Sequence, residues 1–281
     1  KLGYIKFLKQ IMHNLYYNIQ NTESKCNWVM RSLLRGWPRA NRIQQRSDNI
    51  ELIPSHFWGF IENNEHAINT LKHAGVDWYF WDMPYYGRWN GLREAVNPDQ
   101  DFYWRVSKNS VHYKHTRDYP SDRFERWGVQ PKPYASGSKI LICPSSETMT
   151  RWITGMSVDM WVKAITHGLR KYTDRPIEVR YKPRGKGTSG PAVALIPFAE
   201  QAQDTHCVVT SISLCAIEAQ LLGIPTICHP DSFAADISST KLEDIETPFK
   251  TDISQWLYNL AYSQFTHSEI ESGLAYEILN A

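Results

Sequence analysis

No apolar run in this 281-residue sequence reaches the roughly 18 residues that a membrane-spanning helix needs. The first residues, KLGYIKFLKQIMHNLYYNIQ, are amphipathic and interrupted by polar side chains, unlike the apolar core of a signal peptide. The five cysteines form no Cys-x-x-Cys pair, and the ten histidines show no zinc-ligand spacing. We therefore expect a cytoplasmic globular protein with buried free thiols, no metal ion and no membrane span.

The common nucleotide-binding motifs are also missing. The spacing G-x-x-x-x-G-K-[ST] is absent, and no G-x-G-x-x-G follows an expected strand. The stretch GKGTSG contains the right residue types at the wrong spacing. An NTPase with a P-loop and a dehydrogenase are therefore excluded as interpretations.

Charge is present in ordinary amount but is unevenly distributed. Residues 1–134 contain 19 Lys and Arg against 13 Asp and Glu, whereas residues 135–281 contain 12 against 16. A basic first half suggests an anionic partner for that half. The alternative is a chance asymmetry of the kind found in many globular proteins.

Strands and helices alternate along most of the chain. In residues 1–48 we expect a helix and then a basic irregular segment. A strand at 50–61, the helix ENNEHAINTLKHAG and a strand around VDWYFWDMP should form a parallel strand–helix–strand unit, with a possible third strand at 102–107. In the second half we expect strands at 139–144, 177–183, 206–210 and 225–229, with helices at 157–172, within 191–204 and at 212–223. This alternation predicts an α/β protein with parallel sheets. We place one domain at 1–134, with a C-terminal helix 268–281 packed back on it, and a second at 138–265.

Polar side chains follow the expected strands of the second half, where ligands bind in open parallel sheets. They are Ser145 and Ser146, then Lys182, Arg184 and Lys186 in KPRGKGTSG, then Thr210, Ser211 and Ser213, then His229 and Asp231. Hydroxyls at a helix start and cations on a glycine-rich loop suit phosphate groups. Helix capping and an exposed turn are the alternatives for these two segments.

Glu218 is an isolated acid in the apolar stretch ISLCAIEAQLLG. It lies about two turns past Ser211, so its carboxylate is expected to point back toward the same sheet edge. There it can accept hydrogen bonds from the two hydroxyls of a ribose. A buried lone acid would otherwise cost free energy, so the alternative is an ion pair with a nearby Lys or Arg.

These residues carry a family resemblance. The stretch VVTSISLCAIEAQLLGIPTI resembles the C-terminal domain signature of GT-B glycosyltransferases, in which a Ser/Thr-rich turn opens a helix with a ribose-binding Glu. EVRYKPRG resembles the basic strand end of capsule-polysaccharide-type members. HFWGFIENNEHAINTLKHAGVDWYFWDMPYYGRWN and FYWRVSKNSVH are similar to bacteriophage glycosyltransferases, including enzymes that glycosylate modified DNA bases. The resemblance implies two Rossmann-like domains with a cleft between them and a nucleotide sugar held mainly by the second.

Sugar transfer requires a base and stabilisation of the departing diphosphate. We assign the base to Asp82, at a strand's carboxyl end, with His56 and Asp77 as weaker candidates; capping of the next turn is the alternative role of Asp82. Gly59 is expected to let the chain approach the donor closely. The remaining donor contacts are the hydroxyls and cations named above with Glu218, and the acceptor contacts are His56, Tyr85, Arg88 and Arg105.

The sequence therefore predicts a metal-independent glycosyltransferase that requires no cofactor and uses a nucleotide sugar, for which we expect a UDP-sugar. The predicted acceptor is a hydroxymethylated pyrimidine base in double-stranded phage DNA, which places the protein in the host cytoplasm. Three alternatives stay open: transfer to a cell-surface or capsule glycan, a UDP-sugar epimerase of the same fold, and a DNA-binding module without catalysis.

Overall fold

A computed structural model describes residues 12–17, 24–44, 50–60, 64–87, 102–114, 117–181 and 196–281. Contacts between Cα atoms divide the chain into two compact units. The first contains residues 1–124 and 258–281, and the second contains residues 125–257. The chain therefore leaves the first unit, builds the second, and returns to the first along helix α8 (Ser254–Ala261), which contains the second boundary.

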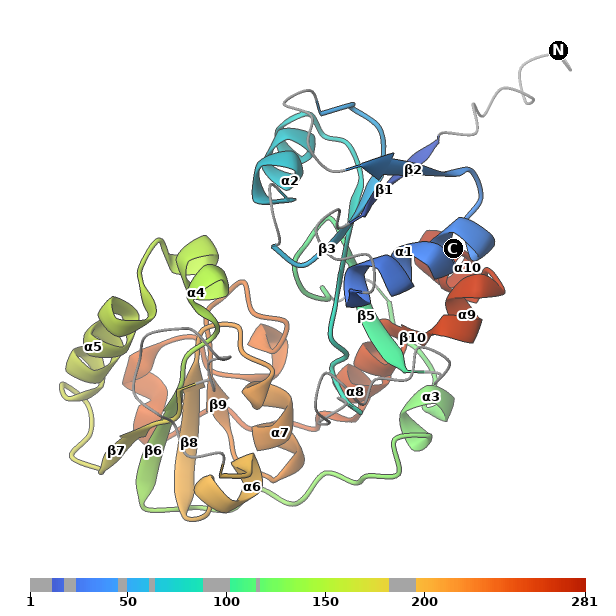
Figure 1. The fold of residues 1–281 in the computed structure, drawn as a ribbon. Helices are drawn as coiled ribbons and strands as arrows, with labels where there is room; N and C mark the ends of the chain where they lie inside the picture. Colours follow the sequence, from blue (N-terminus) through green and yellow to red (C-terminus); the bar gives the residue numbers. More distant parts are fainter. Residues whose placement is uncertain are drawn as a thin grey trace, which may run out of the picture. The chain divides into compact units, whose positions relative to one another are not determined.

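The first unit is built on a mixed sheet (Figure 1). Its described strands are β1 (His13–Tyr17), β2 (Ala40–Gln44), β3 (Ser55–Trp58), β4 (Trp78–Asp82), β5 (Tyr103–Lys108) and β10 (Gln264–Thr266). They follow the order β10–β5–β4–β3–β1–β2. Strands β2, β1, β3 and β4 are mutually parallel, while β5 runs antiparallel to both β4 and β10. The expected parallel strand–helix–strand unit across β3, α2 and β4 is confirmed.

Successive side chains of a strand point to opposite faces of the sheet, and helices pack against the side chains of this sheet. The helices are α1 (Lys25–Gly36), α2 (Asn64–His73), α3 (Asp122–Glu125), α9 (His267–Glu271) and α10 (Leu274–Asn280). Leu15, Tyr79 and Trp81 form one core cluster with Val29 and Leu33 of α1. Helix α9 packs directly against α1, because Gly36 leaves room for the backbone of Ile270.

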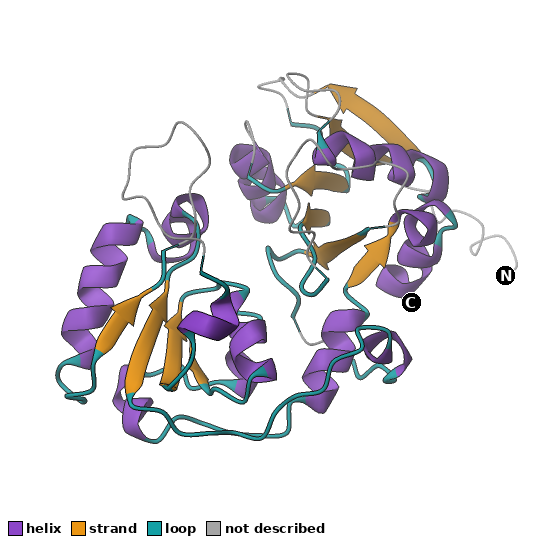
Figure 2. Cartoon of the chain, turned by 60° about the horizontal axis from the view of Figure 1, so that its bottom comes forward, coloured by secondary structure: helices purple, strands orange, loops and turns teal. Residues whose placement is uncertain are grey.

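The second unit has a parallel sheet in the order β7–β6–β8–β9. Its strands are β6 (Lys139–Cys143), β7 (Ile177–Val179), β8 (Thr205–Thr210) and β9 (Thr226–Ile227). Ile140 and Ile142 face one side and pack with helix α5 (Val158–Leu169). Leu141 and Cys143 face the other side and pack near α6 (Phe198–Gln201) and α7 (Cys215–Leu221). Helices thus flank both faces of the sheet (Figure 2).

The remaining described helices of the second unit are α4 (Glu147–Thr154) and the 3₁₀ segments Ala235–Ile237 and Leu242–Glu246. Ser146 and Ser157 cap the starts of α4 and α5 by accepting hydrogen bonds from Met149 N and Met160 N. Within the described ranges, no helix is long and apolar enough to cross a membrane.

The mixed α/β class with parallel sheets is confirmed, but several expected elements are wrong. Residues 13–17 form a strand instead of a helix, since they pair with both β2 and β3. The strand expected from residue 50 begins at Ser55, and the strand at 103–108 is antiparallel. The boundary between the units falls after residue 124, whereas we expected it near 134.

Both units repeat one strand order. Numbered within its own unit, each parallel set runs second, first, third, fourth: β2–β1–β3–β4 and β7–β6–β8–β9. The order reverses between β1 and β3 and again between β6 and β8. In doubly wound sheets of this kind, ligands bind outside the carboxyl ends of the strands at the point of reversal. These two places are where a functional site is to be sought.

Candidate functional site

Three hydroxyl groups meet at the reversal point of the second unit. Ser145 follows β6, and Thr210 and Ser211 end and follow β8, so the parallel strands bring them to one edge. The Oγ atoms of Ser145 and Ser211 lie 2.9 Å apart, and Ile212 N donates to Ser145 Oγ at 3.3 Å. Thr210 Oγ1 donates to the carbonyl oxygen of Cys143 at 2.6 Å. All three side chains are buried, so they fix the shape of the edge.

Ser146, Ser213 and Glu218 form a more accessible layer at the same edge. Ser146 and Ser213 are half-buried, and Glu218 is exposed on the first turn of α7. Ser213 N donates to Thr210 Oγ1 at 3.2 Å, and Cys215 N donates to Ser213 Oγ at 3.3 Å. These bonds order the turn before α7, whose N-cap residue, Leu214, makes no side-chain capping bond. Ser146, Ser213 and Glu218 are accessible to a ligand at this edge.

The exposure of Glu218 corrects one argument. The apolar sequence around it suggested a buried acid whose desolvation demanded a partner. Its neighbours Ile217 and Ala219 are buried, while Glu218 itself faces solvent. The helix is amphipathic, and the acid lies on its polar side. Its position near the reversal point, rather than any burial cost, is what makes it a ligand candidate.

Arg180 also lies at this edge of the sheet, and the sequence did not lead us to predict it as a site residue. It follows β7, and its backbone N–H donates to Ile142 O at 2.8 Å. Its guanidinium donates to Ile196 O at 2.9 Å and to Gln201 Oε1 at 2.6 Å. The only signal was its place in EVRYKPRG, at the end of an apolar strand. Lys182, Arg184 and Lys186, predicted just beyond it, lie outside the described residues.

Histidine 229 completes this edge on the β9 side. Its backbone N–H donates to Ser211 O at 3.1 Å, and its Nδ1 accepts from Asp231 N at 3.1 Å. The residue after β9 is thus tied to the residue after β8. These contacts order the edge, and the His229 side chain is half-buried.

In the first unit, Gly59 stands at the corresponding reversal point, directly after β3. Its φ of +51° is a left-handed conformation that glycine adopts without strain, and no atom lies within 4 Å of a Cβ built there. Its N–H donates to Trp81 O at 2.9 Å, and its carbonyl accepts from Asn64 Nδ2 at 3.0 Å. The backbone conformation therefore favours glycine, and a side chain at this position would meet no described atom.

Asp82 ends β4 and is held by a buried arginine. Its Oδ2 accepts from Arg105 at 2.8 Å, and its Oδ1 accepts from Met83 N at 2.7 Å. The Asp82 side chain is 30% exposed, whereas that of Arg105 is 2% exposed. Arg105 also donates to Val111 O at 2.7 Å and lies between the rings of Phe80 and Tyr85. The structure thus brings Asp82 and Arg105 together, with Asp82 reachable and Arg105 enclosed.

His56 belongs to a buried aromatic cluster. Its Nδ1 accepts from Trp81 Nε1 at 3.0 Å, and its Nε2 lies 3.2 Å from His13 Nδ1. Its ring stacks on Tyr79 at 4.5 Å between centroids. Because one nitrogen accepts, the other carries the proton, and the ring is neutral. Burial lowers the pKa of His56 well below its ordinary value and that of His13 to about 4.

Tyr85 is likewise enclosed. Its phenol oxygen accepts from Tyr113 N at 2.6 Å, and its own N–H donates to Gln264 Oε1 at 2.9 Å. The first bond ties the segment after β4 to the segment after β5, and the second ties it to β10. Arg88, the fourth predicted acceptor residue, lies outside the described part of the chain.

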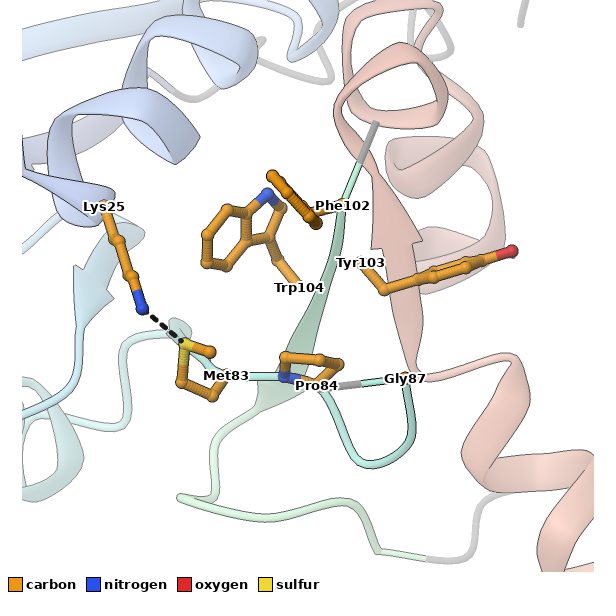
Figure 3. A pocket seen from close by; sticks show the side chains of 7 residues that line it. All are labelled: Lys25, Met83, Pro84, Gly87, Phe102, Tyr103 and Trp104. Atoms are coloured by element: carbon orange, nitrogen blue, oxygen red, sulfur yellow. Dashed lines mark hydrogen bonds between the residues drawn. The ribbon is translucent and has the colours of Figure 1, made fainter. Parts of the chain in front are cut away.

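A small pocket opens beyond the carboxyl end of β4 in the first unit (Figure 3). Its lining residues are Lys25, Met83, Pro84, Gly87, Phe102, Tyr103 and Trp104. Lys25 Nζ donates to Met83 Sδ at 3.5 Å, and the side chains of Phe102 and Trp104 line the same pocket. Trp104 Nε1 donates to His267 Nε2 at 2.9 Å, which fixes the indole ring.

Among the described residues, no group of three or more His, Cys, Asp and Glu side chains could hold a metal ion. The described edges offer hydroxyl groups, the carboxylates of Asp82 and Glu218 and the guanidinium of Arg180. Hydroxyls and a carboxylate suit the polar groups of a nucleotide, and a carboxylate beside open space suits proton transfer.

Comparisons with known proteins support the fold. No protein-family model matches the chain, and no curated protein sequence matches it. The chain is similar to a solved structure described as KpsC of Thermosulfurimonas dismutans, β-Kdo 2,4-transferase, with a TM-score of 0.51 and 13% identity. That match covers 90% of this chain and 91% of the other.

A second solved structure, described as the β-Kdo 2,7-transferase of the same KpsC, has a TM-score of 0.53 and 14% identity. It covers 95% of this chain and 99% of the other. Both matches extend through both units. At this identity the likeness establishes a shared fold and nothing beyond it.

Proposed function

We propose that the protein is a GT-B glycosyltransferase that transfers a sugar from a nucleotide-sugar donor to a hydroxyl group of a glycan. The observation that carries the proposal is the hydroxyl-lined reversal point of the second unit, with Glu218 exposed beside it. The likeness to two Kdo transferases along most of the chain supports it.

The donor is proposed to bind at the second unit. Glu218 accepts hydrogen bonds from the ribose hydroxyls, while Ser146 and Ser213 contact the phosphates. Ser145, Thr210 and Ser211 act as positioning residues, because they are buried and bonded to one another and to the backbone. Lys182, Arg184 and Lys186 are proposed to neutralise the diphosphate, and Arg180 to order the strand end that precedes them.

The acceptor is proposed to bind at the first unit, near Asp82 and Gly59. As the acceptor oxygen attacks the anomeric carbon, its proton passes to the Asp82 carboxylate and the bond from carbon to phosphate oxygen breaks. The nucleotide leaves with the negative charge. Arg105 orients the Asp82 carboxylate through its 2.8 Å contact.

A glycan acceptor accounts for the observations better than duplex DNA. The DNA interpretation used Arg105 as a phosphate contact, but this side chain is enclosed by Phe80 and Tyr85 and paired with Asp82. The solved structures similar to this chain are described as Kdo transferases.

The donor proposal is tested by thermal-shift titration with UDP-, GDP-, TDP- and CMP-linked sugars and the free nucleotides. We expect one nucleotide to raise the melting temperature of the native protein and of the control Glu200→Gln, but not of Glu218→Gln. Glu200 is an exposed acid on α6, and its replacement by Gln removes the same charge as Glu218→Gln. Absence of stabilisation by every nucleotide in the native protein would overturn the proposal.

The acceptor is then identified by incubating the protein and its donor with acidic oligosaccharides, neutral oligosaccharides and hydroxymethylated duplex DNA. We expect transfer to oligosaccharide. Transfer to DNA alone would replace the glycan by the base, and donor turnover without any acceptor would indicate an epimerase.

A further inference from the structure

Two cysteine thiols meet at the proposed donor edge of the second unit. Cys143 is the last residue of β6 and is completely buried, while Cys215 is the first residue of α7 and is half-buried. Their side chains are joined by a hydrogen bond and pack in the same cluster with Val208 and Ala219. The thiols come from segments far apart in the sequence, so the fold itself creates the pair.

We propose that Cys143 and Cys215 form an oxidation site at which hydrogen peroxide makes a reversible disulfide bond and thereby blocks the donor edge. The effect on donor binding rests on the proposed function, whereas disulfide formation does not.

The two thiols have unequal chemistry. The hydrogen bond from Cys143 stabilises the Cys215 thiolate and lowers the pKa of Cys215 below its ordinary value. The same hydrogen bond, together with burial, raises the pKa of Cys143. Cys215 is also the more accessible of the two. Since a thiolate is the reactive form of cysteine, Cys215 is the nucleophile and Cys143 the second thiol of the pair.

The reaction balances with peroxide as the oxidant. The Cys215 thiolate attacks one peroxide oxygen, the O–O bond breaks, and the hydroxide that leaves takes up a proton to become water. Cys215 is then a sulfenic acid. The Cys143 sulfur attacks the Cys215 sulfur, the S–O bond breaks, and the hydroxyl leaves as water with the Cys143 proton. Two thiols and one peroxide thus give one disulfide and two waters, and an added dithiol reverses the change.

The position of Cys215 links this chemistry to the donor edge. Its backbone N–H donates to Ser213 Oγ at 3.3 Å, and Glu218 lies on the same first turn of α7. A bond to Cys143 would pull this turn toward β6 and change the placement of Ser213 and Glu218. Donor binding is therefore expected to weaken when the disulfide forms.

The other cysteines are placed differently. Cys26 donates to Tyr16 O at 3.4 Å, and Cys207 donates to Val208 O at 3.7 Å. Burial raises the pKa of Cys207 and raises that of Cys228 to about 11. All three are buried. They provide internal controls for the reactivity of Cys215 within one sample.

The test treats the folded, reduced chain with hydrogen peroxide and follows the cysteines by peptide mass spectrometry. We expect a Cys143–Cys215 cross-link that dithiothreitol reverses, forming about tenfold faster than Cys26, Cys207 or Cys228 is oxidised. In Cys143→Ser, dimedone should trap a sulfenic acid at Cys215. In Cys215→Ser, the cross-link and the trapped product should both disappear while the melting temperature stays close to that of the reduced native chain.

Equal oxidation of all five cysteines, or a cross-link that requires prior unfolding in urea, would overturn the site. Nucleotide stabilisation is then measured on oxidised and reduced protein. Full stabilisation of the cross-linked protein would overturn the block at the donor edge. If reduced protein binds no nucleotide while the cross-link still forms, the proposed function fails and the oxidation site stands.

Discussion

At the scale of single residues, a charged side chain near a candidate site can have a catalytic or a structural role, and its burial distinguishes the two roles. Arg105 and Asp82 illustrate this, because Arg105 was predicted to contact the acceptor and Asp82, from its place at a strand end, to accept the proton. The structure encloses Arg105 in the first unit and leaves part of Asp82 reachable. Under the proposed function, Arg105 is a positioning residue for Asp82, and Asp82 is the more accessible member of the pair.

Replacing Asp82 by Asn should lower both stability and activity. The buried Arg105 charge would lose its 2.8 Å partner, so the free energy of unfolding should fall by about 3 kcal/mol. Turnover should fall by about a hundredfold or more when assayed well below the new melting temperature. The measurements are urea unfolding and kcat.

The matched control is Asp77→Asn, since Asp77 pairs with Lys108 at the surface of the same unit. It should cost less than about 1 kcal/mol. A stable but inactive Asp82→Asn would contradict the structural part of this account, and a full rate would contradict the catalytic part.

At the scale of elements, close backbone contact between helices depends on single glycines. A Cβ at Gly36 would lie 1.7 Å from Ile270 O, so α9 could not approach the end of α1. Gly36→Ala should therefore destabilise the first unit by about 3 kcal/mol through overpacking. Equilibrium urea unfolding measures the loss.

The control for Gly36→Ala is Leu34→Ala, because Leu34 is exposed on the same helix. Its effect should stay within about 0.5 kcal/mol. Hydrogen exchange should show faster exchange in α9 of Gly36→Ala and unchanged exchange in α5. Equal stability of the two variants would mean that α9 can move away from α1 without cost.

Element prediction succeeded where a strand is apolar along its whole length. KILIC and HCVVT are buried on both faces of a parallel sheet, so composition alone marks them as strands. It failed for HNLYY and QFT. These are short strands whose pairing partners are distant in sequence, and β10 becomes a strand only because it pairs with β5. No local periodicity encodes such pairing.

The candidate site could likewise be predicted only in part from the sequence. The Ser/Thr-rich turn and Glu218 follow from the rule that ligands bind at carboxyl ends of parallel strands. Which hydroxyls are buried could not be predicted, because it depends on the approach of β6 to β8, which brings Ser145 to Ser211. The same approach created the Cys143–Cys215 contact.

At the scale of the whole molecule, stability should depend on pH through buried neutral histidines. Burial lowers the pKa of His13 to about 4 and lowers that of His56, while an unfolded histidine titrates near 6.5. Below about pH 6.5 the unfolded chain takes up protons that the folded chain does not. The melting temperature should therefore be highest above this pH and fall as the pH decreases toward 4.

His13→Asn removes one of these groups and should flatten the pH dependence between 6.5 and 4. His66→Asn, an exposed change in the same unit, should leave the slope of the native protein unchanged. Differential scanning calorimetry across this pH range makes the comparison. Parallel slopes for the two variants would show that His13 is protonated in the folded state.

The return of the chain to its first unit has a consequence for synthesis on the ribosome. Strand β10 completes the first sheet beside β5, and Arg123 holds the same segment by bonds to Ala261 O, Gln264 O and Glu269. These partners are translated after the whole of the second unit. We therefore expect the second unit to fold first on a nascent chain, and the first unit to complete its fold only after β10 has been translated.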